Sequence, residues 1–246
     1  MLKQDTKLTA KGVAYSFTKP LHWQKKDFET LGTLLFGSAS LSFADKPVRV
    51  FFKNNTNDFP KIIRDFGWYF GSPQNYFIAN AGLYGFGLFT KNEKIRRTSI
   101  LIITSSITTG LIQTFSKNAI GRARPSSGNY LDFKPFANSS RYRSFPSGHT
   151  VLSITMAHSI AKQFKNTWTK IGIYTIGAIP PISRLVDDAH WLTDIAFSTV
   201  LSIIVVDSVD KFLFKENTFD IIKPNKNKVT WNFTFSGNQI GFVGRF

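Results

Sequence analysis

The sequence predicts an all-α protein, a bundle of about six helices followed by a short tail that resembles a β-hairpin. The chain contains six long stretches without a charged residue, and proline stands at the ends of some of them. Strict alternation of apolar and polar residues appears only after Lys228. With 246 residues, 42% of them hydrophobic, and no internal repeat, the chain is expected to fold around one sizeable core.

The six uncharged stretches define the expected helices, because they are longer than ordinary strands. They are residues 30–44, 66–90, 98–116, 144–161, 171–183 and 195–206. Residues 98–116 form the best candidate for a membrane span, whereas the last two stretches are short for one. The mean hydropathy of −0.09 is low for a protein that is mostly embedded in a membrane. Six buried helices of a water-soluble globule therefore remain an open alternative.

Proline marks two helix boundaries. Pro146 and Ser147 are expected to open the helix of residues 144–161, because proline is tolerated in the first turn and serine can cap it. Pro180 and Pro181 are expected to end the preceding part of residues 171–183, because proline lacks an amide hydrogen and clashes with the turn before it.

The chain divides into three expected regions. Residues 1–27 form a basic N-terminal segment in which no cleavable secretory signal is recognised, and residues 28–215 form the helical domain. Residues 216–246 form a linker and a hairpin-like tail. In that tail Trp231, Phe233 and Phe235 alternate with polar residues, and residues 236–238 can turn the chain back.

The charge balance restricts the class of partner. The chain carries 31 Lys and Arg against 15 Asp and Glu, a net charge of +16, so an anionic partner is expected: nucleic acid, a membrane surface or a phosphate-bearing substrate. No recognisable nucleic-acid-binding motif accompanies this charge. Because there is no cysteine, disulfides, thiolate nucleophiles, iron–sulfur clusters and Cys-ligated zinc are excluded. With only four histidines, a His-rich metal site is not expected.

Three polar clusters stand at the ends of apolar stretches, where their side chains can converge without placing charge in a core. The first contains Lys117 and Arg124, followed by Pro125. Lysine supplies a compact cation and arginine a planar fork that matches two phosphate oxygens. Taken alone, this cluster is equally typical of a solvated basic helix end.

The second cluster is Pro146-Ser147-Gly148-His149. The unpaired amides at a helix N-terminus favour an anion, glycine lets a ligand approach the backbone, and His149 would lie within reach of that anion. Taken alone, the same residues are compatible with an ordinary helix cap.

The third cluster runs from Ser183-Arg184 to His190 and Asp194. His190 and Asp194 are four residues apart, so on one helix they would share a face and the carboxylate could hold the imidazole in one tautomer. Such a pair can act as a nucleophile or a base, although many His–Asp pairs are only surface contacts.

Together, and at these spacings, the three clusters resemble the type 2 phosphatidic acid phosphatase and vanadium haloperoxidase superfamily. The pattern is Lys, six residues, Arg-Pro; then Pro-Ser-Gly-His; then Ser-Arg, five residues, His, three residues, Asp. All three parts are complete between Lys117 and Asp194. The resemblance implies a helical bundle with its active site at the helix ends.

The resemblance also implies roles for individual residues. His190 would attack phosphorus to form a phosphohistidine, Asp194 would orient His190, and His149 would protonate the leaving oxygen and then activate water. Neutral His190 and protonated His149 would be needed at the same time, and modest differences in environment around a pKa of about 6.5 could produce that split. Phosphate oxygens would be bound by Lys117, Arg124, Ser147, Gly148 and Arg184. No metal or other cofactor is implied.

Other polar residues near these clusters are predicted to have no direct role in catalysis or phosphate binding. Arg122 would point away from Arg124 on a helix, so it is left outside the phosphate contacts. Asp187 and Asp188 are interpreted as loop residues that balance Arg184 or other cations, rather than as magnesium ligands. His158 lies within an apolar helical run and is interpreted as a packed or interface histidine.

The function expected from the resemblance is a metal-independent phosphatase acting on phosphate monoesters or diphosphates of a membrane lipid. Phosphatidate, phosphatidylglycerophosphate, a polyprenyl diphosphate and a phosphorylated glycolipid are all open as substrates. The expected location is the cell envelope, as an integral membrane protein with its active site on the extracytoplasmic side. The charged flanks permit this topology without requiring it. A soluble periplasmic acid phosphatase and a vanadium-dependent haloperoxidase remain as alternatives.

Overall fold

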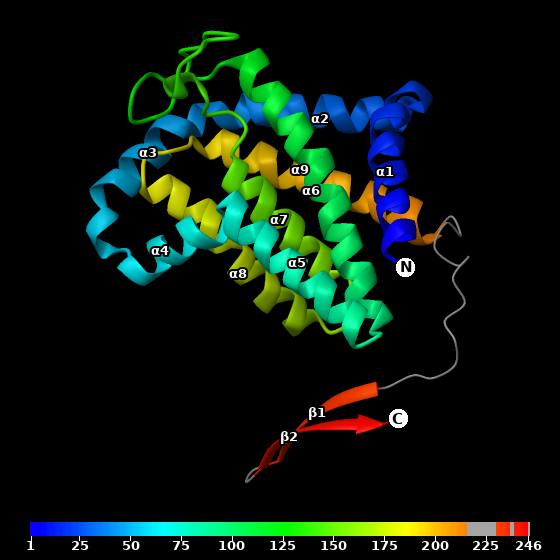
Figure 1. The fold of residues 1–246 in the computed structure, drawn as a ribbon. Coiled ribbons are helices and arrows are strands. Elements are labelled where there is room, and N and C mark those ends of the chain that lie inside the picture. The colour runs from blue at the N-terminus through cyan, green and yellow to red at the C-terminus, as the bar shows by residue number, and fades with distance from the viewer. Residues whose placement is uncertain (216–229, 237–238, 246) are drawn as a thin grey trace.

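A computed structural model describes residues 1–215, 230–236 and 239–245 of the chain (Figure 1). Those residues form nine α-helices and one pair of antiparallel strands. The helices are α1 (Leu2–Thr18), α2 (Lys25–Leu41), α3 (Asp45–Asn54), α4 (Lys61–Phe70), α5 (Pro73–Phe89), α6 (Glu93–Ile120), α7 (Gly148–Ala161), α8 (Thr167–Val186) and α9 (Leu192–Asp210), and the strands are β1 (Thr230–Ser236) and β2 (Gln239–Arg245).

The all-α prediction and the predicted hairpin are both confirmed. Strands β1 and β2 pair so that Phe233 lies opposite Phe242. The expected linker, residues 216–229, and residues 237–238 of the expected turn lie outside the described residues.

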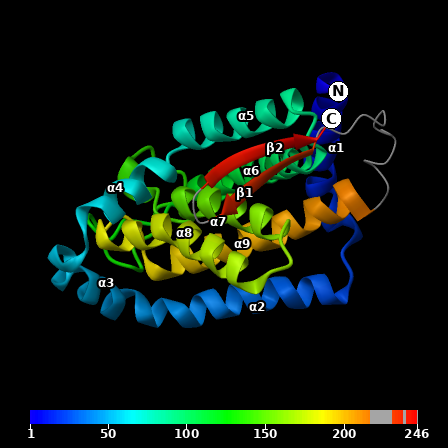
Figure 2. The ribbon, with the colours of Figure 1, turned by 90° about the horizontal axis from the view of Figure 1, so that it is seen from below.

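The helices pack around α7, which contacts α6, α8 and α9. Helix α5 packs on α6 and α2 lies along α9, so these two long helices flank the central ones from opposite sides (Figure 2). Helix α4 packs on α8, and α1 packs on α6. Four helix ends meet at one end of this body: the C-terminal ends of α6 and α8 and the N-terminal ends of α7 and α9.

Each of the six uncharged stretches lies mostly in an α-helix, although residues 144–147 precede α7 and residues 42–44 form a 3₁₀ turn after α2. The helix boundaries differ further from the expectation at two places. Residues 66–90 are divided at Gly71 and Ser72 into α4 and α5. Helix α8 does not end at Pro180 and Pro181 but continues to Val186. Both prolines are buried in the contacts of α8 with α4 and α7, and this packing compensates for the backbone hydrogen bonds that proline removes.

Two helices were not expected from the charge-free stretches, because both contain charged residues. Helix α1 carries several lysines, yet it buries Asp5, Leu8 and Gly12 against the bundle. Helix α3 begins at Asp45, whose side chain is fully buried. Both helices place a carboxylate in the interior, where it pairs with an arginine: Asp5 with Arg96, and Asp45 with Arg122.

The interior of the body holds many small hydroxyl side chains beside its apolar core, and many large apolar side chains lie on the surface. In α6, Ser99, Thr104 and Thr108 are fully buried. On the surface, Phe89 is 90% exposed and Trp168 is 80% exposed. Two helices, Glu93–Ile120 and Leu192–Phe214, are long and apolar enough to cross a membrane, although both are about half buried inside the protein.

Candidate active site

The four converging helix ends enclose a cavity of about 800 Å³. Six of the eight residues predicted to bind phosphate or to act in catalysis line this cavity. These are Lys117, Arg124, Gly148, His149, Arg184 and His190. The other two predicted residues, Ser147 and Asp194, are fully buried and do not line it.

Helix α6 carries Lys117 in its last turn and ends at a left-handed glycine, Gly121, with φ of 58°. A Cβ atom on Gly121 would lie 1.9 Å from the carbonyl oxygen of Lys134, so only glycine fits there. The turn at Gly121 changes the direction of the chain, so that the side chain of Arg124 lines the cavity. Its Nη1 donates to the carbonyl oxygen of Ala189 at 3.1 Å, which fixes the guanidinium beside the cavity.

Arg184 reaches the cavity from the last turn of α8 and is 2% exposed. Its guanidinium lies over the Trp68 ring at 4.7 Å and donates to Asp187 at 2.6 Å. Asp187 also accepts from Arg64, and Asp188 pairs with Arg49 at 2.7 Å. The structure therefore confirms that both aspartates balance arginines. Within residues 1–214, no group of three or more His, Asp or Glu residues is arranged to hold a metal ion.

His190 and Asp194 do meet, but not on one helical face as considered from their spacing. Helix α9 begins at Leu192, so His190 precedes the helix while Asp194 lies in its first turn. The His190 Nδ1 to Asp194 Oδ2 distance is 3.6 Å, an ion-pair distance that is longer than a hydrogen bond. Because Nδ1 faces the carboxylate, Nε2 is the nitrogen available to the cavity.

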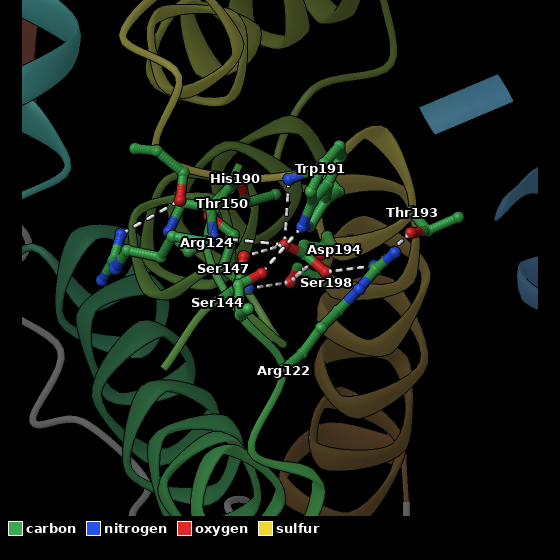
Figure 3. Close-up of polar contacts among 12 residues, drawn as sticks. Arg122, Arg124, Ser144, Ser147, Thr150, His190, Trp191, Thr193, Asp194 and Ser198 are labelled. Carbon is green, nitrogen blue, oxygen red and sulfur yellow. Dashed lines mark hydrogen bonds and ion pairs between the residues drawn. The ribbon is translucent and has the colours of Figure 1, made fainter. Parts of the chain in front are cut away.

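Asp194 is held from several sides (Figure 3). Its Oδ2 accepts from the backbone amide of Trp191 at 2.9 Å and from the hydroxyl of Ser144, and its Oδ1 accepts from Arg122 Nη1 at 2.7 Å. Arg122 lies in the loop after α6, so the prediction that it is part of a helix was wrong. Its exclusion from the cavity is nevertheless confirmed. Sequence reasoning missed Arg122 and Ser144 as partners of Asp194.

His149 is positioned by packing from the junction of α4 and α5. Its ring lies 5.4 Å from the ring of Trp68. A Cβ atom on Gly71 would lie 2.6 Å from His149 Cδ2, so the glycine provides the space that the imidazole occupies. Nε2 of His149 is buried and makes no hydrogen bond within the described residues. Neither Trp68 nor Gly71 was singled out from the sequence, because no pattern links residues 68–71 to His149.

Both histidines have pKa values well below the usual 6.5. Burial lowers the pKa of His149 to about 4, and the charges of Arg184, His190 and Lys117 lower it further. Burial also lowers the pKa of His190 to about 4, against the opposing effect of Asp194. The protein's own groups therefore keep both imidazoles neutral at neutral pH. The expected split between a neutral His190 and a protonated His149 does not arise from the protein alone.

Ser147 occupies the N-cap position of α7 behind the cavity wall, although its side chain makes no capping hydrogen bond to the backbone. Its backbone amide donates to Ser198 Oγ at 2.8 Å, and its hydroxyl oxygen accepts from Thr150 at 3.0 Å. These contacts fix the N-terminus of α7, where Gly148 and His149 line the cavity. Direct contact between Ser147 and a phosphate stays a prediction.

The rest of the cavity wall is mostly apolar. It extends from the cationic end between α4, α5 and α6, along Phe77, Ile107 and Leu111. These three side chains are 44%, 37% and 52% exposed, so the wall is continuous with the outer surface of the bundle. Gly110 lies on this wall, and a Cβ atom there would meet no other part of the described structure within 4 Å.

His158 lies near the opposite end of α7 from His149. Its Nδ1 contacts the Tyr174 hydroxyl at 2.6 Å and its Nε2 contacts Asp207 at 3.1 Å. The interpretation of His158 as a packed histidine outside the cavity is confirmed.

Comparison with known proteins gives three similarities. Residues 98–216 match the family model described as the PAP2 superfamily. Lipid A 1-phosphatase from Porphyromonas gingivalis is 22% identical over 130 residues, which cover 52% of this chain and 26% of that protein. This chain thus spans about a quarter of that relative's length. The crystal structure of Aquifex aeolicus LpxE is 20% identical, with a TM-score of 0.47, and the match covers 65% of this chain and 93% of that one.

Proposed function

Residues 98–216 of this chain belong to the PAP2 superfamily, and on that premise we propose that the protein is a phosphatase that hydrolyses the phosphate ester or diphosphate of a membrane lipid. One observation carries this proposal. Three cations and two histidines line one end of a cavity whose remaining wall is mostly apolar and open to the surface of the bundle.

The first chemical step is transfer of the phosphoryl group to His190. Nε2 of His190 attacks phosphorus, the bond between phosphorus and the leaving oxygen breaks, and a proton from His149 goes to that oxygen. Lys117, Arg124 and Arg184 neutralise the charge on the phosphate oxygens, with the Gly148 amide at the α7 N-terminus and the Ser147 hydroxyl as further predicted donors.

The second step regenerates the protein. Neutral His149 takes a proton from water, the resulting hydroxide attacks phosphorus, and the bond from phosphorus to His190 Nε2 breaks. When inorganic phosphate leaves, His149 returns its proton to solvent, and it is protonated again when the next anionic substrate binds. No step requires a metal ion or another cofactor.

The substrate supplies the protonation of His149. Burial and three neighbouring cationic or histidine groups lower the pKa of this imidazole to about 4. A phosphate dianion placed among Arg184 and Lys117 opposes those charges and favours the imidazolium. The proton donor is thus formed when an anionic substrate binds. Asp194 behind His190 keeps the proton of that imidazole on Nδ1, which leaves Nε2 free to attack phosphorus.

The apolar wall supports a lipid as the substrate. A phosphate at the cationic end leaves room for an acyl or prenyl chain along Phe77, Ile107 and Leu111. Gly110→Leu tests this assignment, because a Cβ atom at Gly110 meets no other part of the described structure within 4 Å and the rest of the new side chain would fill the apolar part of the cavity. We expect turnover of dioctanoyl phosphatidate to fall about 10-fold while turnover of para-nitrophenyl phosphate changes less than about 2-fold. Gly172→Leu, at an open position of α8 outside the cavity, is the matched control.

The same proposal places the protein in the cell envelope, as an integral membrane protein. Its surface carries large apolar residues on several helices, and α6 and α9 are long and apolar enough to cross a bilayer. The end of the body away from the cavity carries the basic residues Lys91, Lys94, Arg97, Lys162 and Lys165. The loops at the cavity end are also basic, so the preference for basic residues on the cytoplasmic side permits an extracytoplasmic cavity without requiring it. Carbonate extraction of membranes tests the embedding, and release of full activity into the soluble fraction would favour the soluble phosphatase.

A phosphatase assay with trapping of the intermediate tests the activity. Purified protein in detergent should release inorganic phosphate from phosphatidate in the presence of EDTA. Acid-labile, base-stable labelling from ³²P-substrate should appear in the wild type and be absent from His190→Ala. Undiminished turnover in His190→Ala would overturn the phosphohistidine mechanism, and activity that depends on a divalent ion would overturn metal independence. Peroxide-dependent halide oxidation with added vanadate would instead support the haloperoxidase.

A further inference from the structure

Arg122 and Arg124 are two residues apart in one loop, yet their side chains do different things. Arg124 lines the cavity, whereas Arg122 does not and is 4% exposed. Arg122 lies on the far side of Asp194 from His190 (Figure 3). A second buried carboxylate, Asp45 at the start of α3, lies against the same guanidinium.

The guanidinium of Arg122 is fully engaged within the protein. Its Nε and Nη2 donate to the carbonyl oxygen of Tyr130 at 3.1 and 3.0 Å, and its Nη2 also donates to Asp45 Oδ2 at 2.6 Å. Its Nη1 donates to Asp194 Oδ1 at 2.7 Å and to the hydroxyl of Thr193. An arginine has five N–H groups, so no donor is left for a phosphate.

Asp45 joins this network to the start of α9. Its Oδ1 accepts from the backbone amide of Thr193 at 2.9 Å, and its Oδ2 accepts from the Thr193 hydroxyl at 2.7 Å. The amide of Thr193 is one of the unpaired donors at a helix N-terminus. Asp45 therefore caps the helix that carries Asp194, from a distant part of the chain.

The charges of the network are unequal. One guanidinium lies between two carboxylates, and Asp45 and Asp194 are both fully buried. If Asp45 were absent, Arg122 would pair with Asp194 alone and neutralise it. With Asp45 present, the guanidinium is shared, and Asp194 keeps negative charge toward the Nδ1 side of His190. That charge matters when Nε2 bonds to phosphorus, because the imidazole ring then becomes cationic.

We propose that Arg122 and Asp45 are positioning residues for phosphoryl transfer to His190: Arg122 fixes the carboxylate of Asp194, and Asp45 holds Arg122 so that Asp194 stays oriented and negative behind the imidazole. This inference rests on the proposed phosphatase function. Neither residue touches the substrate, so both act on the chemical step rather than on binding of the anion.

The test compares Arg122→Gln with Arg124→Gln, two neutralising changes in the same loop. For Arg122→Gln we expect kcat on para-nitrophenyl phosphate to fall about 10- to 100-fold, with KM and inhibition by inorganic phosphate changed less than about 2-fold. For Arg124→Gln we expect weaker inhibition by inorganic phosphate and a higher KM, because a cation of the cavity wall is lost. Arg122→Lys should recover part of kcat, since it keeps the charge while losing the fork.

Asp45→Asn keeps the proposal testable if Arg122→Gln does not fold, because it preserves side-chain volume and an acceptor oxygen. We expect kcat to fall about 3- to 10-fold at unchanged KM, with slower formation of the labelled phosphoenzyme in single turnover. Folding of each variant is checked by circular dichroism and thermal melting.

Three outcomes would overturn the inference. The first is a folded Arg122→Gln or Asp45→Asn variant with wild-type kcat. The second is a rise in KM and in the inhibition constant for phosphate in Arg122→Gln equal to that of Arg124→Gln, which would make Arg122 a phosphate ligand. The third is a wild type that forms no phosphoenzyme, which would remove the proposed function as well. Normal phosphoenzyme formation by the wild type together with unaffected Arg122 and Asp45 variants would overturn this inference alone.

Discussion

His190 and His149 line the same cavity, but the groups behind them differ in kind. Behind His190 lies a buried carboxylate, Asp194, which is itself held by hydrogen bonds and an ion pair. Behind His149 lie an aromatic ring, Trp68, and the space left by Gly71. One imidazole is thus placed by charge and the other by packing.

This difference matches the two chemical roles proposed for them. A nucleophile that becomes cationic benefits from a fixed negative charge behind it. A proton donor must instead respond to the charge of the substrate. Nε2 of His149 has no hydrogen-bond partner within the described residues, and burial together with the neighbouring cations lowers the pKa of this imidazole to about 4, so it is sensitive to an arriving anion. Substitutions at or around either histidine should therefore have distinguishable effects.

The largest effect is expected from His190→Ala. Without the imidazole no phosphohistidine can form, and we expect turnover to fall at least about 10⁴-fold for every phosphate ester. Steady-state assays on para-nitrophenyl phosphate and dioctanoyl phosphatidate measure the loss. An unchanged circular dichroism spectrum shows that the fold is intact, and near-normal activity in that variant would remove His190 from the nucleophile role.

His149→Gln should have a smaller effect that depends on the leaving group. General acid catalysis contributes about 10²- to 10⁴-fold, and a leaving group that needs no proton does not use it. We expect a loss of this size on dioctanoyl phosphatidate and a smaller loss in the phosphorylation step with para-nitrophenyl phosphate. In the wild type, kcat should fall as pH rises through the pKa of substrate-bound His149, and this alkaline limb should vanish in the variant. Equal losses on both substrates would contradict the proton-donor role.

Gly71→Ala tests the packing side alone. The backbone φ at Gly71 is −84°, which alanine adopts without strain, so the cost arises only from the contact of the new Cβ with His149. Displacement of the imidazole should lower kcat about 10-fold on dioctanoyl phosphatidate. Gly82→Ala in α5, where a Cβ meets no other part of the described structure within 4 Å, should retain wild-type activity. If both variants behave alike, packing at Gly71 does not position His149.

Acid stability tests the burial of His190. Its pKa is about 4 in the folded protein and about 6.5 when exposed, so the unfolded state takes up a proton first as pH falls. Stability contributed by the neutral imidazole is complete above pH 6.5 and is lost as pH falls toward 4. At pH 5 this loss amounts to about 2 kcal/mol, or about 4–8 °C in Tm. Melting at pH 7 and pH 5 should show a smaller difference for His190→Asn than for the wild type.

The smallest effect is expected from His158→Gln. His158 contacts both an aromatic residue and a carboxylate, but it lies outside the cavity. Its ring contacts Tyr174 and Asp207 at the other end of α7. We expect activity on both substrates within about 2-fold of the wild type. A larger loss of kcat in a folded variant would show that the chemistry extends beyond the cavity.

The sequence allowed the helical class to be predicted because buried or lipid-facing helices need long uncharged stretches, and six such stretches are present. It did not reveal α1 or α3, whose charged residues are paired in the interior. It was also misleading at Pro180 and Pro181, where packing of α8 against two neighbours holds a helix that local propensity would end.

For the candidate site, the polar clusters at the ends of apolar stretches indicated that side chains could converge, and the family resemblance of the three clusters implied one shared anion site. Lys117, Arg124, His149, Arg184 and His190 all line one cavity. The partners of the two histidines could not be predicted in the same way. Asp45 and Trp68 lie far along the chain from His190 and His149, and no local pattern connects them. Arg122 was noticed in the sequence, but it was expected to lie on a helix, and the left-handed turn at Gly121 ends the helix before it.

The sequence by itself determined the all-α class and the residue types available for phosphate chemistry, because hydrophobic patterning and side-chain chemistry are local properties. Only the tertiary structure decided how each histidine is held and what its pKa is. Those properties depend on burial and on charges contributed by helices distant in sequence: Asp45 from α3, Trp68 from α4 and Arg184 from α8. Electrostatic and packing effects act through space, so they appear only when these helices are brought together.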